Sequence, residues 1–252
     1  MGSARTVAVG VLFFGTVLWA QQRDWILSRE ITAPVDVLRY FPLQAGNRWI
    51  YDYEYRTGDP ERPTVQRWTS EVTVAEHVRV PEGLVVLRKV VAPQAPPGQF
   101  EVEHYLIRGN YVYAFGEVLW DRPRRSFSAG FRDRLAQGDV VPDFFFPLRE
   151  NLLFAEKDRE DREYREWQDA RKHPEPFYHW LVEGRGGQGR SVKLSVFPQA
   201  FRLVYATIGG PTERWFEAGV GVVGEWNRHH GTYWETTIRL QKFIRTPATP
   251  KK

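Results

Sequence analysis

The segment 49–56, Trp-Ile-Tyr-Asp-Tyr-Glu-Tyr-Arg, constrains the fold more than any other part of this sequence. Every odd position is aromatic and most even positions are polar. Because successive side chains of a β-strand point to opposite faces, this period of two predicts a half-buried strand with an aromatic ladder on one face. The chain is therefore expected to build its core on a β-sheet.

The same alternation returns along most of the chain. Strands are predicted over residues 49–56, 70–80, 84–91, 100–108, 111–115, 180–183, 192–197, 201–207, 214–226 and 233–243, and residues 40–48 are predicted to form a turn. Short glycine- or proline-containing connections favour an antiparallel meander over βαβ units. The predicted fold is mainly β, with a single curved antiparallel sheet or a half-barrel or barrel-like domain.

Two segments depart from this pattern. Residues 121–150 are predicted to be irregular. In residues 156–172, opposite charges stand four positions apart, as in the pair Asp158 and Arg162, which is typical of an exposed helix. A charged loop is the alternative for this insertion.

The N-terminal residues 1–20 have the three-part pattern of a signal peptide: Arg5, an apolar run, and Ala20 before the expected cleavage point. An uncleaved anchor is the alternative, although the run is shorter than the about 20 residues that span a bilayer. We expect a lead-in at 21–38, a β-rich domain at 39–245 and a disordered tail at 246–252. Phe-Pro-Leu occurs at 41–43 and again at 146–148, which leaves open two related β-halves.

Composition excludes several classes of site. Hydrophobic residues make up 42% of the 252 residues and aromatic residues 15%, which is enough to bury a sizeable core. The chain has no cysteine, which excludes disulfides, thiolate metal sites and a cysteine nucleophile. The net charge of +4 arises from 35 basic and 31 acidic residues, a balance that does not indicate a nucleic-acid partner.

Two short blocks carry a resemblance to a group of proteins. The first runs Tyr-Phe-Pro-Leu at 40–43 and then Gly46-Asn47-x-Trp49-x-Tyr51; the second is Trp-Phe-x-Ala-Gly-Val-Gly-x-Val at 215–223. Together they resemble secreted or periplasmic bacterial proteins of unknown function. The resemblance implies a shared architecture and export, and it implies no reaction, substrate or catalytic residue. Many of those proteins carry a lipid-attachment cysteine, which this chain lacks.

The glycines of the second block suggest how the chain ends meet. Gly219 and Gly221 leave a bare strip of backbone, which large rings such as Trp49, Tyr51 or Tyr53 could cover. We therefore predict that the strand starting at Trp49 lies beside or over residues 218–225.

Most sequence motifs of catalytic or ligand-binding type lack the structural context that their chemistry needs. Residues 184–189 match Gly-x-Gly-x-x-Gly, but a strand pattern follows where phosphate binding needs a helix N-terminus, so a hairpin connection is expected. No metal site and no cofactor are expected; the candidate ligands would be Glu225, His229 and His230 beside a predicted turn. Asp139 and Asp143 stand close to three phenylalanines, which could raise a carboxyl pKa for acid–base work, with loop capping as the alternative.

The number of large rings suggests a ligand groove. The chain has ten tryptophans, more than one core usually takes, and a curved sheet could present some of them in an aromatic-lined concavity. The candidate ligand-binding residues are Trp49, Tyr51, Tyr53, Trp215, Trp226 and Trp234.

These observations predict a non-catalytic exported protein of the cell envelope, periplasmic or extracellular, that acts as a binding or accessory component. Its expected partner is a lipid-like or other apolar ligand, or an envelope protein. Membrane contact is expected only if residues 1–20 are retained. A structural subunit of an envelope complex and an envelope hydrolase are the alternatives.

Overall fold

The computed structural model describes residues 25–95, 103–155, 178–186, 195–207, 209–229 and 231–247. The predicted signal peptide at 1–20 and the predicted helix at 156–172 lie outside the described residues, as do His230, most of the expected tail and the second half of the Gly-x-Gly-x-x-Gly segment. Among the described residues, no helix is long and apolar enough to cross a membrane.

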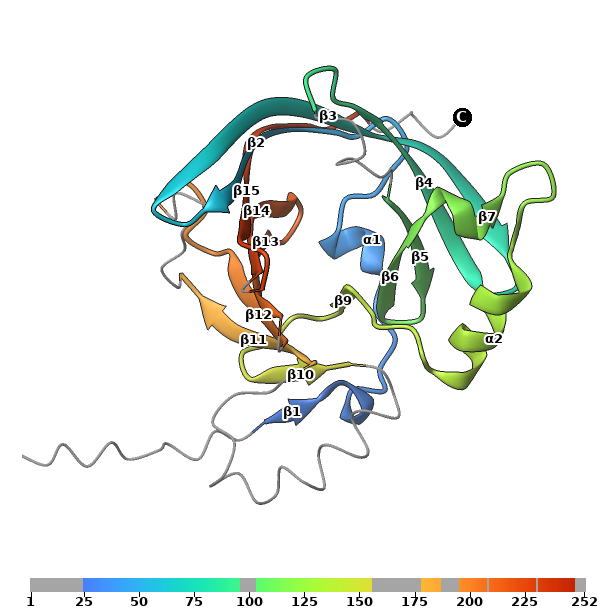
Figure 1. The fold of residues 1–252 in the computed structure, drawn as a ribbon. Helices are drawn as coiled ribbons and strands as arrows, with labels where there is room; N and C mark the ends of the chain where they lie inside the picture. Colours follow the sequence, from blue (N-terminus) through green and yellow to red (C-terminus); the bar gives the residue numbers. More distant parts are fainter. Residues whose placement is uncertain are drawn as a thin grey trace, which may run out of the picture.

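The described chain forms one large, curved and open sheet of thirteen strands, in the order β1-β10-β11-β12-β13-β14-β15-β2-β3-β4-β5-β6-β9 (Figure 1). The strands are β1 (Ile26–Leu27), β2 (Arg48–Asp59), β3 (Arg62–Val80), β4 (Gly83–Val91), β5 (Glu103–Arg108), β6 (Tyr111–Gly116), β9 (Phe144–Phe145), β10 (Leu152–Phe154), β11 (Trp180–Arg185), β12 (Phe201–Thr207), β13 (Gly210–Glu217), β14 (Gly221–His229) and β15 (Trp234–Ile244). All neighbouring pairs are antiparallel except β1 and β10. The prediction of a mainly β protein built on one curved antiparallel sheet is confirmed.

Small elements complete the fold. A separate two-stranded ribbon consists of β7 (Trp120–Asp121) and β8 (Ser126–Phe127). The helices are α1 (Val37–Tyr40), α2 (Ala129–Gln137) and the 3-10 turns η1 (Ser28–Glu30) and η2 (Glu117–Leu119). In Figure 1, α1 lies inside the curve of the sheet, whereas α2 lies outside it, beyond β4 and β6.

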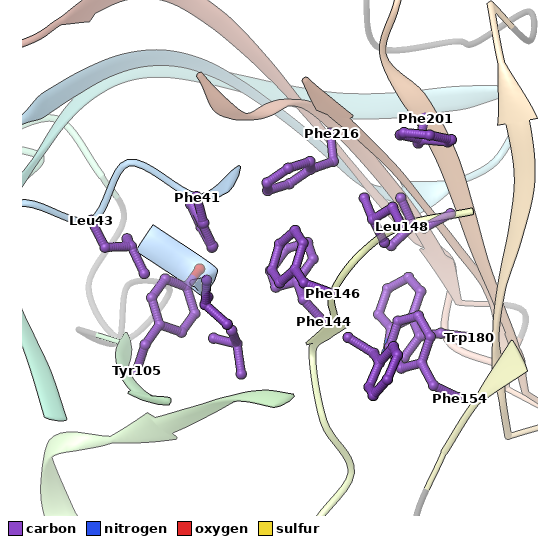
Figure 2. Packing of buried hydrophobic residues seen from close by; sticks show 14 of the residues in the cluster. Phe41, Leu43, Tyr105, Phe144, Phe146, Leu148, Phe154, Trp180, Phe201 and Phe216 are labelled. Carbon is purple, nitrogen blue, oxygen red and sulfur yellow. The ribbon is translucent and has the colours of Figure 1, made fainter. Parts of the chain in front are cut away.

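The sheet consists of two meanders joined in the middle. Strands β2 to β6 follow one another in space as in sequence, and so do β10 to β15; the β15–β2 pair connects the two runs. One Phe-Pro-Leu segment precedes β2 and the other precedes β10. The rings of Phe41 and Phe146 lie 6.4 Å apart in a core cluster to which both meanders contribute (Figure 2).

The two sequence blocks contact each other in the folded chain. The Trp49 indole Nε1 donates a hydrogen bond to the Val220 carbonyl (2.6 Å), and the Tyr51 hydroxyl donates one to the Val222 carbonyl (2.9 Å). The prediction that this strand lies beside or over residues 218–225 is thus confirmed. Because β15 stands between β2 and β14, the contact is made by rings reaching over the curved sheet.

Two residues of the sequence blocks, Asn47 and Gly221, make contacts that other residue types could not make in the same place. Asn47 is fully buried; its side-chain amide donates to the Pro42 carbonyl (2.7 Å), and its side-chain oxygen accepts from the Thr246 backbone N–H (2.8 Å). Gly221 has φ +103°, and a Cβ there would lie 2.9 Å from the Phe41 ring. Asn47 connects the start of β2 to the segment after β15, and Gly221 leaves room for Phe41, so the two sequence blocks have a role in the fold itself.

Three sequence predictions of local structure are wrong. Residues 214–226 form two strands, not one, because the chain turns at 218–220, where Gly219 has φ +79°. Residues 121–150 are not irregular throughout, since they contain α2, which buries only Phe131 and Leu135 and so shows little periodicity. Residues 195–197 form a turn in which Val196 is 62% exposed, so the strand predicted over 192–197 does not extend to them.

The two faces of the sheet bury different sets of side chains. The concave face and α1 form the main cluster, which includes Phe41, Phe144 and Phe216 (Figure 2). On the outer face of β3 to β6, α2 and the β7–β8 ribbon cover a second cluster of aromatic and aliphatic side chains. A third cluster lies around Trp215 and Trp226.

Candidate functional site

A cavity of about 390 Å³ lies on the concave face of the sheet. Its lining combines apolar and charged side chains: Phe41, Leu43, Trp49, Tyr51, Tyr53, Val72, Arg88, Val90, Glu103, Tyr105, Arg214, Val222, Glu225 and Ile238. This size falls within the range of small-molecule sites, which are commonly apolar with a few placed polar groups. The cavity is therefore the candidate functional site.

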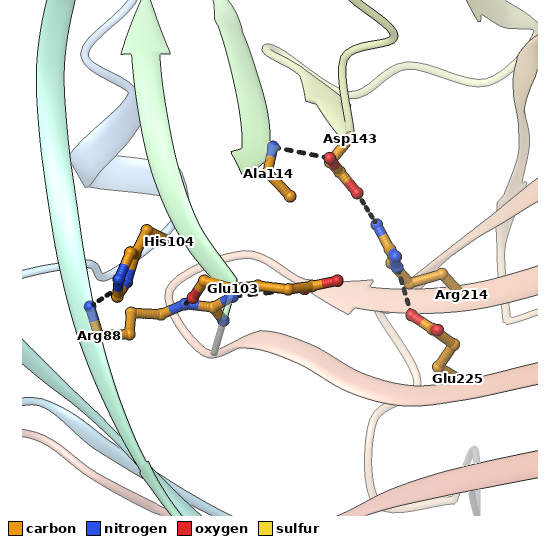
Figure 3. Close-up of polar contacts among 7 residues, drawn as sticks. All are labelled: Arg88, Glu103, His104, Ala114, Asp143, Arg214 and Glu225. Carbon is orange, nitrogen blue, oxygen red and sulfur yellow. Dashed lines mark hydrogen bonds and ion pairs between the residues drawn. The ribbon is translucent and has the colours of Figure 1, made fainter. Parts of the chain in front are cut away.

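Arg214 of β13 is held between two acidic side chains, as Figure 3 shows. Its Nε donates to a Glu225 carboxylate oxygen (2.6 Å), and a terminal nitrogen donates to Asp143 (3.3 Å). The guanidinium also lies 4.8 Å from the ring centre of Trp180 and 5.0 Å from that of Phe144. Burial disfavours its charge, but the carboxylates of Glu225 and Asp143 outweigh this and raise the pKa of Arg214 above its ordinary value. Arg214 thus has its charge compensated within the protein.

Asp143 uses both carboxylate oxygens in contacts with the protein. One accepts from the Ala114 backbone N–H (2.8 Å) and the other from Arg214. Burial raises the pKa of Asp143, against the opposing effect of Arg214, in the direction expected for a carboxyl close to aromatic rings. Asp139 lies just beyond α2, where its backbone N–H donates to the Arg134 carbonyl (2.8 Å). Asp139 is not among the residues that line the cavity.

Arg88 of β4 is the second arginine of the cavity, and its surroundings differ. Its side chain is only 13% exposed, and its guanidinium lies 3.9 Å from the centre of the Tyr105 ring. Its Nε donates to the backbone carbonyl of Glu103 (2.5 Å), and a terminal nitrogen lies 3.4 Å from the Glu103 carboxylate, which is 61% exposed (Figure 3). The acidic partner of Arg88 is thus a largely solvent-exposed carboxylate.

The tyrosines of the cavity are neutral groups. Burial raises the pKa of Tyr51 and Tyr53 well above the ordinary value and raises that of Tyr105 to about 12. At neutral pH all three phenols are therefore protonated. They can donate hydrogen bonds but cannot act as phenolate bases.

Three of the six residues predicted to bind a ligand converge on this cavity: Trp49, Tyr51 and Tyr53. Trp215 and Trp226 are buried in the third cluster, with Ala200 and Val223, and do not line the cavity. Trp234 lies at the end of the β14–β15 hairpin, where its ring stacks on His229 with centroids 5.8 Å apart. Alternation alone did not separate the two sides of the sheet.

Sequence reasoning missed the charged members of the site, above all Arg88 and Arg214. A signal for Arg88 was present, since it shares a strand face with the apolar residues Val86 and Val90. A cation on the apolar face of a predicted strand requires an explanation, because burying a charge is costly unless it is paired.

The two candidate metal ligands that the structure describes, Glu225 and His229, each contact other protein groups. Glu225 is paired with Arg214, whereas the His229 ring Nδ1 lies 3.2 Å from both the backbone nitrogen and the carbonyl of Thr232. His230 lies outside the described residues. In the described part of the chain, no group of three histidine, aspartate or glutamate side chains could hold a metal ion.

A second cavity, of about 620 Å³, lies between η1, the β5–β6 turn and α2. Its two arginines, Arg29 and Arg108, are exposed, and Arg108 donates to the Leu135 carbonyl at the end of α2 (3.3 Å). None of the six predicted ligand-binding residues lines it. It lacks the buried charges of the concave cavity.

Comparison with known proteins yields distant structural similarity only. No protein-family model and no curated protein sequence matches this chain. A "putative lipoprotein" of Parabacteroides distasonis is similar over 82% of this chain and 99% of its own, with 10% identity and a TM-score of 0.39. A "putative exported protein with YmcC-like fold" from Bacteroides fragilis covers the same shares, with 12% identity and a TM-score of 0.34.

Proposed function

We propose that this protein is a non-catalytic, exported binding protein of the cell envelope that holds a lipid-like or other apolar ligand in the cavity on its concave face. The observation that carries the proposal is the cavity of about 390 Å³, bordered by Trp49, Tyr51 and Tyr53. Aromatic side chains offer a large apolar contact area at a low cost in conformational entropy, which suits them to ligand binding.

The state of the ionisable groups supports binding over hydrolysis. Glu225 lines the cavity and Asp143 does not, and both carboxylates have Arg214 as their partner. A general acid or base needs a carboxyl that can exchange its proton with a substrate. Here each carboxylate oxygen of Asp143 already accepts a hydrogen bond from the protein, and neither Asp143 nor Asp139 lines the cavity.

The described surface gives little support to a structural subunit. Its exposed large hydrophobic side chains are four valines on separate elements: Val65, Val91, Val118 and Val196. Single exposed apolar residues are normal, whereas a subunit contact needs a contiguous patch. Export is supported by the signal-peptide pattern of residues 1–20.

The test blocks the cavity without changing the rest of the sheet. Val90 lines the cavity, and its neighbour Val91 is 48% exposed on the opposite face of β4. We expect Val90→Trp to weaken binding of the fluorescent probe N-phenyl-1-naphthylamine by about tenfold or more, because the indole occupies the cavity. Val91→Trp is the matched control and should bind the probe as the wild type does.

Both variants should melt within a few degrees of the wild type. Absence of probe binding to the wild type would contradict the proposal, as would equal binding by Val90→Trp. Native mass spectrometry of the protein purified from the periplasm supplies an independent readout, since a bound apolar molecule adds a defined mass.

A further inference from the structure

Building on the proposed function, we infer that the cavity selects a singly charged anionic amphiphile, a long-chain carboxylate, whose head group binds Arg88. Its chain would lie against the rings and aliphatic side chains of the same cavity. The inference depends on a difference between the two arginines that face this space.

The positive charge of Arg214 is already compensated by carboxylates of the protein, so Arg214 is a poor site for a ligand anion. It contacts two carboxylates, and the side chains of Asp143 and Glu225 are only 23% and 19% exposed. In such surroundings a cation and its partners attract each other more strongly than in water. A ligand anion would have to displace a partly buried carboxylate to reach Arg214.

Arg88, in contrast, has hydrogen-bond donors that the described residues do not use. Among the described residues, its guanidinium hydrogen bonds are those to the Glu103 carbonyl and, at 3.4 Å, to the Glu103 carboxylate. These use Nε and one terminal nitrogen, so the other terminal nitrogen is left for a ligand. Because Glu103 is 61% exposed, solvent screens its attraction for Arg88, and a ligand carboxylate can replace it at little cost.

The geometry of Arg88 suits a carboxylate. The Tyr105 ring covers one face of the guanidinium at 3.9 Å and so fixes the plane of the group. The free terminal nitrogen and the second N–H of the other terminal nitrogen lie along one edge of the guanidinium, and two donors so placed match the two oxygens of a carboxylate. Lysine in the same place would provide charge but not this paired geometry.

The remaining lining determines the rest of the ligand. Beyond Arg88, the cavity presents Val72, Val90, Val222 and Ile238 as well as the aromatic rings. The Tyr51 hydroxyl is already donating to the Val222 carbonyl, which leaves fewer polar partners for a sugar. Glu225 and Glu103 also border the space, so a second negative charge on the head group would be repelled.

The experiment compares ligands with the same chain and different head groups. Dodecanoate, dodecanol, dodecylammonium and dodecyl phosphate are titrated into the whole exported protein at neutral pH, with affinity measured by calorimetry or by displacement of the fluorescent probe. We expect dodecanoate to bind about tenfold or more tightly than dodecanol, because it adds a charge-assisted hydrogen-bonded pair. Dodecylammonium should bind least well.

The variants assign this preference to Arg88. Arg88→Met should reduce dodecanoate affinity to the level of dodecanol and leave dodecanol binding unchanged. Arg88→Lys should keep part of the preference, and it provides the test if Arg88→Met does not fold. The matched control is Arg79→Met, since Arg79 is exposed on β3 and does not line the cavity.

The outcomes separate this inference from the proposed function. If dodecanoate and dodecanol bind wild type equally, or if Arg88→Met keeps the preference, the head-group assignment is wrong while the cavity remains a binding site. Tighter binding of dodecyl phosphate would likewise overturn the choice of a carboxylate. If neither the probe nor any of the four ligands binds, the proposed function itself fails.

Discussion

His104 and Tyr105 are neighbours on β5 but belong to opposite sides of the sheet. The His104 ring packs edge-on to Phe115, on the face covered by α2, with centroids 5.5 Å apart. The Tyr105 ring borders the concave cavity. One side of the same strand is thus filled with side chains and the other is left partly open.

What lies over each face accounts for the difference. Over the outer face, α2 and the β7–β8 ribbon supply Phe127 and Phe131, whose rings lie 4.9 and 6.0 Å from that of Phe115. Among the described residues, the helix inside the curve of the sheet is the short α1, which spans only four residues (Figure 1). The comparison shows that the same alternation produces a closely packed cluster on the outer face and, on the concave face, a core cluster that leaves a cavity.

The rings of the two faces are also held in different ways. Phe127 has only van der Waals and ring contacts to fix it, with Trp120 at 5.0 Å and Phe131 at 4.7 Å. On the concave face, Trp49 and Tyr51 are tied by hydrogen bonds to backbone carbonyls. A ring anchored at its polar tip can border an empty space without losing its position.

The largest effect should come from the packed face. Phe127 is 2% exposed, and Phe127→Ala should lower the free energy of unfolding by about 3–5 kcal/mol, since it removes a ring and leaves a void that the structure cannot close. Denaturant unfolding measures the loss.

The matched variant on the concave face is Tyr53→Ala. Tyr53 stacks on Trp68 at 5.2 Å but borders the cavity on another side. Its truncation should cost less than half as much as that of Phe127, because water can fill the space. An equal loss for both variants would show that the concave face is packed as tightly as the outer one.

A smaller effect should appear as pH falls, through His104 on the packed face. His104 is fully buried, and burial lowers its pKa from 6.5 to about 4, with the nearby charge of Arg88 acting in the same direction. The folded state therefore disfavours the protonated ring. Its contribution to stability is fully present above pH 6.5 and is lost as the pH falls towards 4.

This loss should amount to about 2–3 kcal/mol between about pH 7.5 and 4.5. His104→Gln should lack it, since glutamine does not titrate and its side-chain oxygen can accept from the Arg88 backbone N–H in place of His104 Nδ1 (3.1 Å). The difference between wild type and variant is the quantity to follow, because Asp143 titrates with a raised pKa in both. Parallel pH profiles would contradict the prediction, since they would show that folding does not lower the pKa of His104.

The sequence predicted the structure correctly where a short segment has a clear local pattern. The period of two over 49–56 predicted β2, and the glycines of the second block predicted its contact with Trp49 and Tyr51. Both inferences use local geometry: alternation assigns side chains to faces, and a bare backbone strip invites a ring.

The rest depended on tertiary arrangement that no local pattern contains. Trp215 and Trp49 both lie on strands rich in rings, yet one is on the far side of the sheet from the cavity. A bulge between Trp215 and Phe216 shifts the register of β13 against β14, so counting alternate residues along 214–226 could not assign the faces. The burial of Arg214 depends on its contact with Asp143, which is 71 positions away in the sequence, and no local pattern predicts that contact.

The smallest effect should come from the polar tip of one ring on the concave face. Tyr51→Phe removes only the hydroxyl that donates to the Val222 carbonyl, so the ring and the cavity remain. We expect a loss of about 1 kcal/mol in the free energy of unfolding, the usual cost of one hydrogen bond whose acceptor is left without its donor. Tyr55→Phe, on the same strand and half-buried, should change the stability by less than about 0.5 kcal/mol. If both variants have the same free energy of unfolding, the hydroxyl of Tyr51 does not stabilise the concave face, and the rings of both faces are held by packing alone.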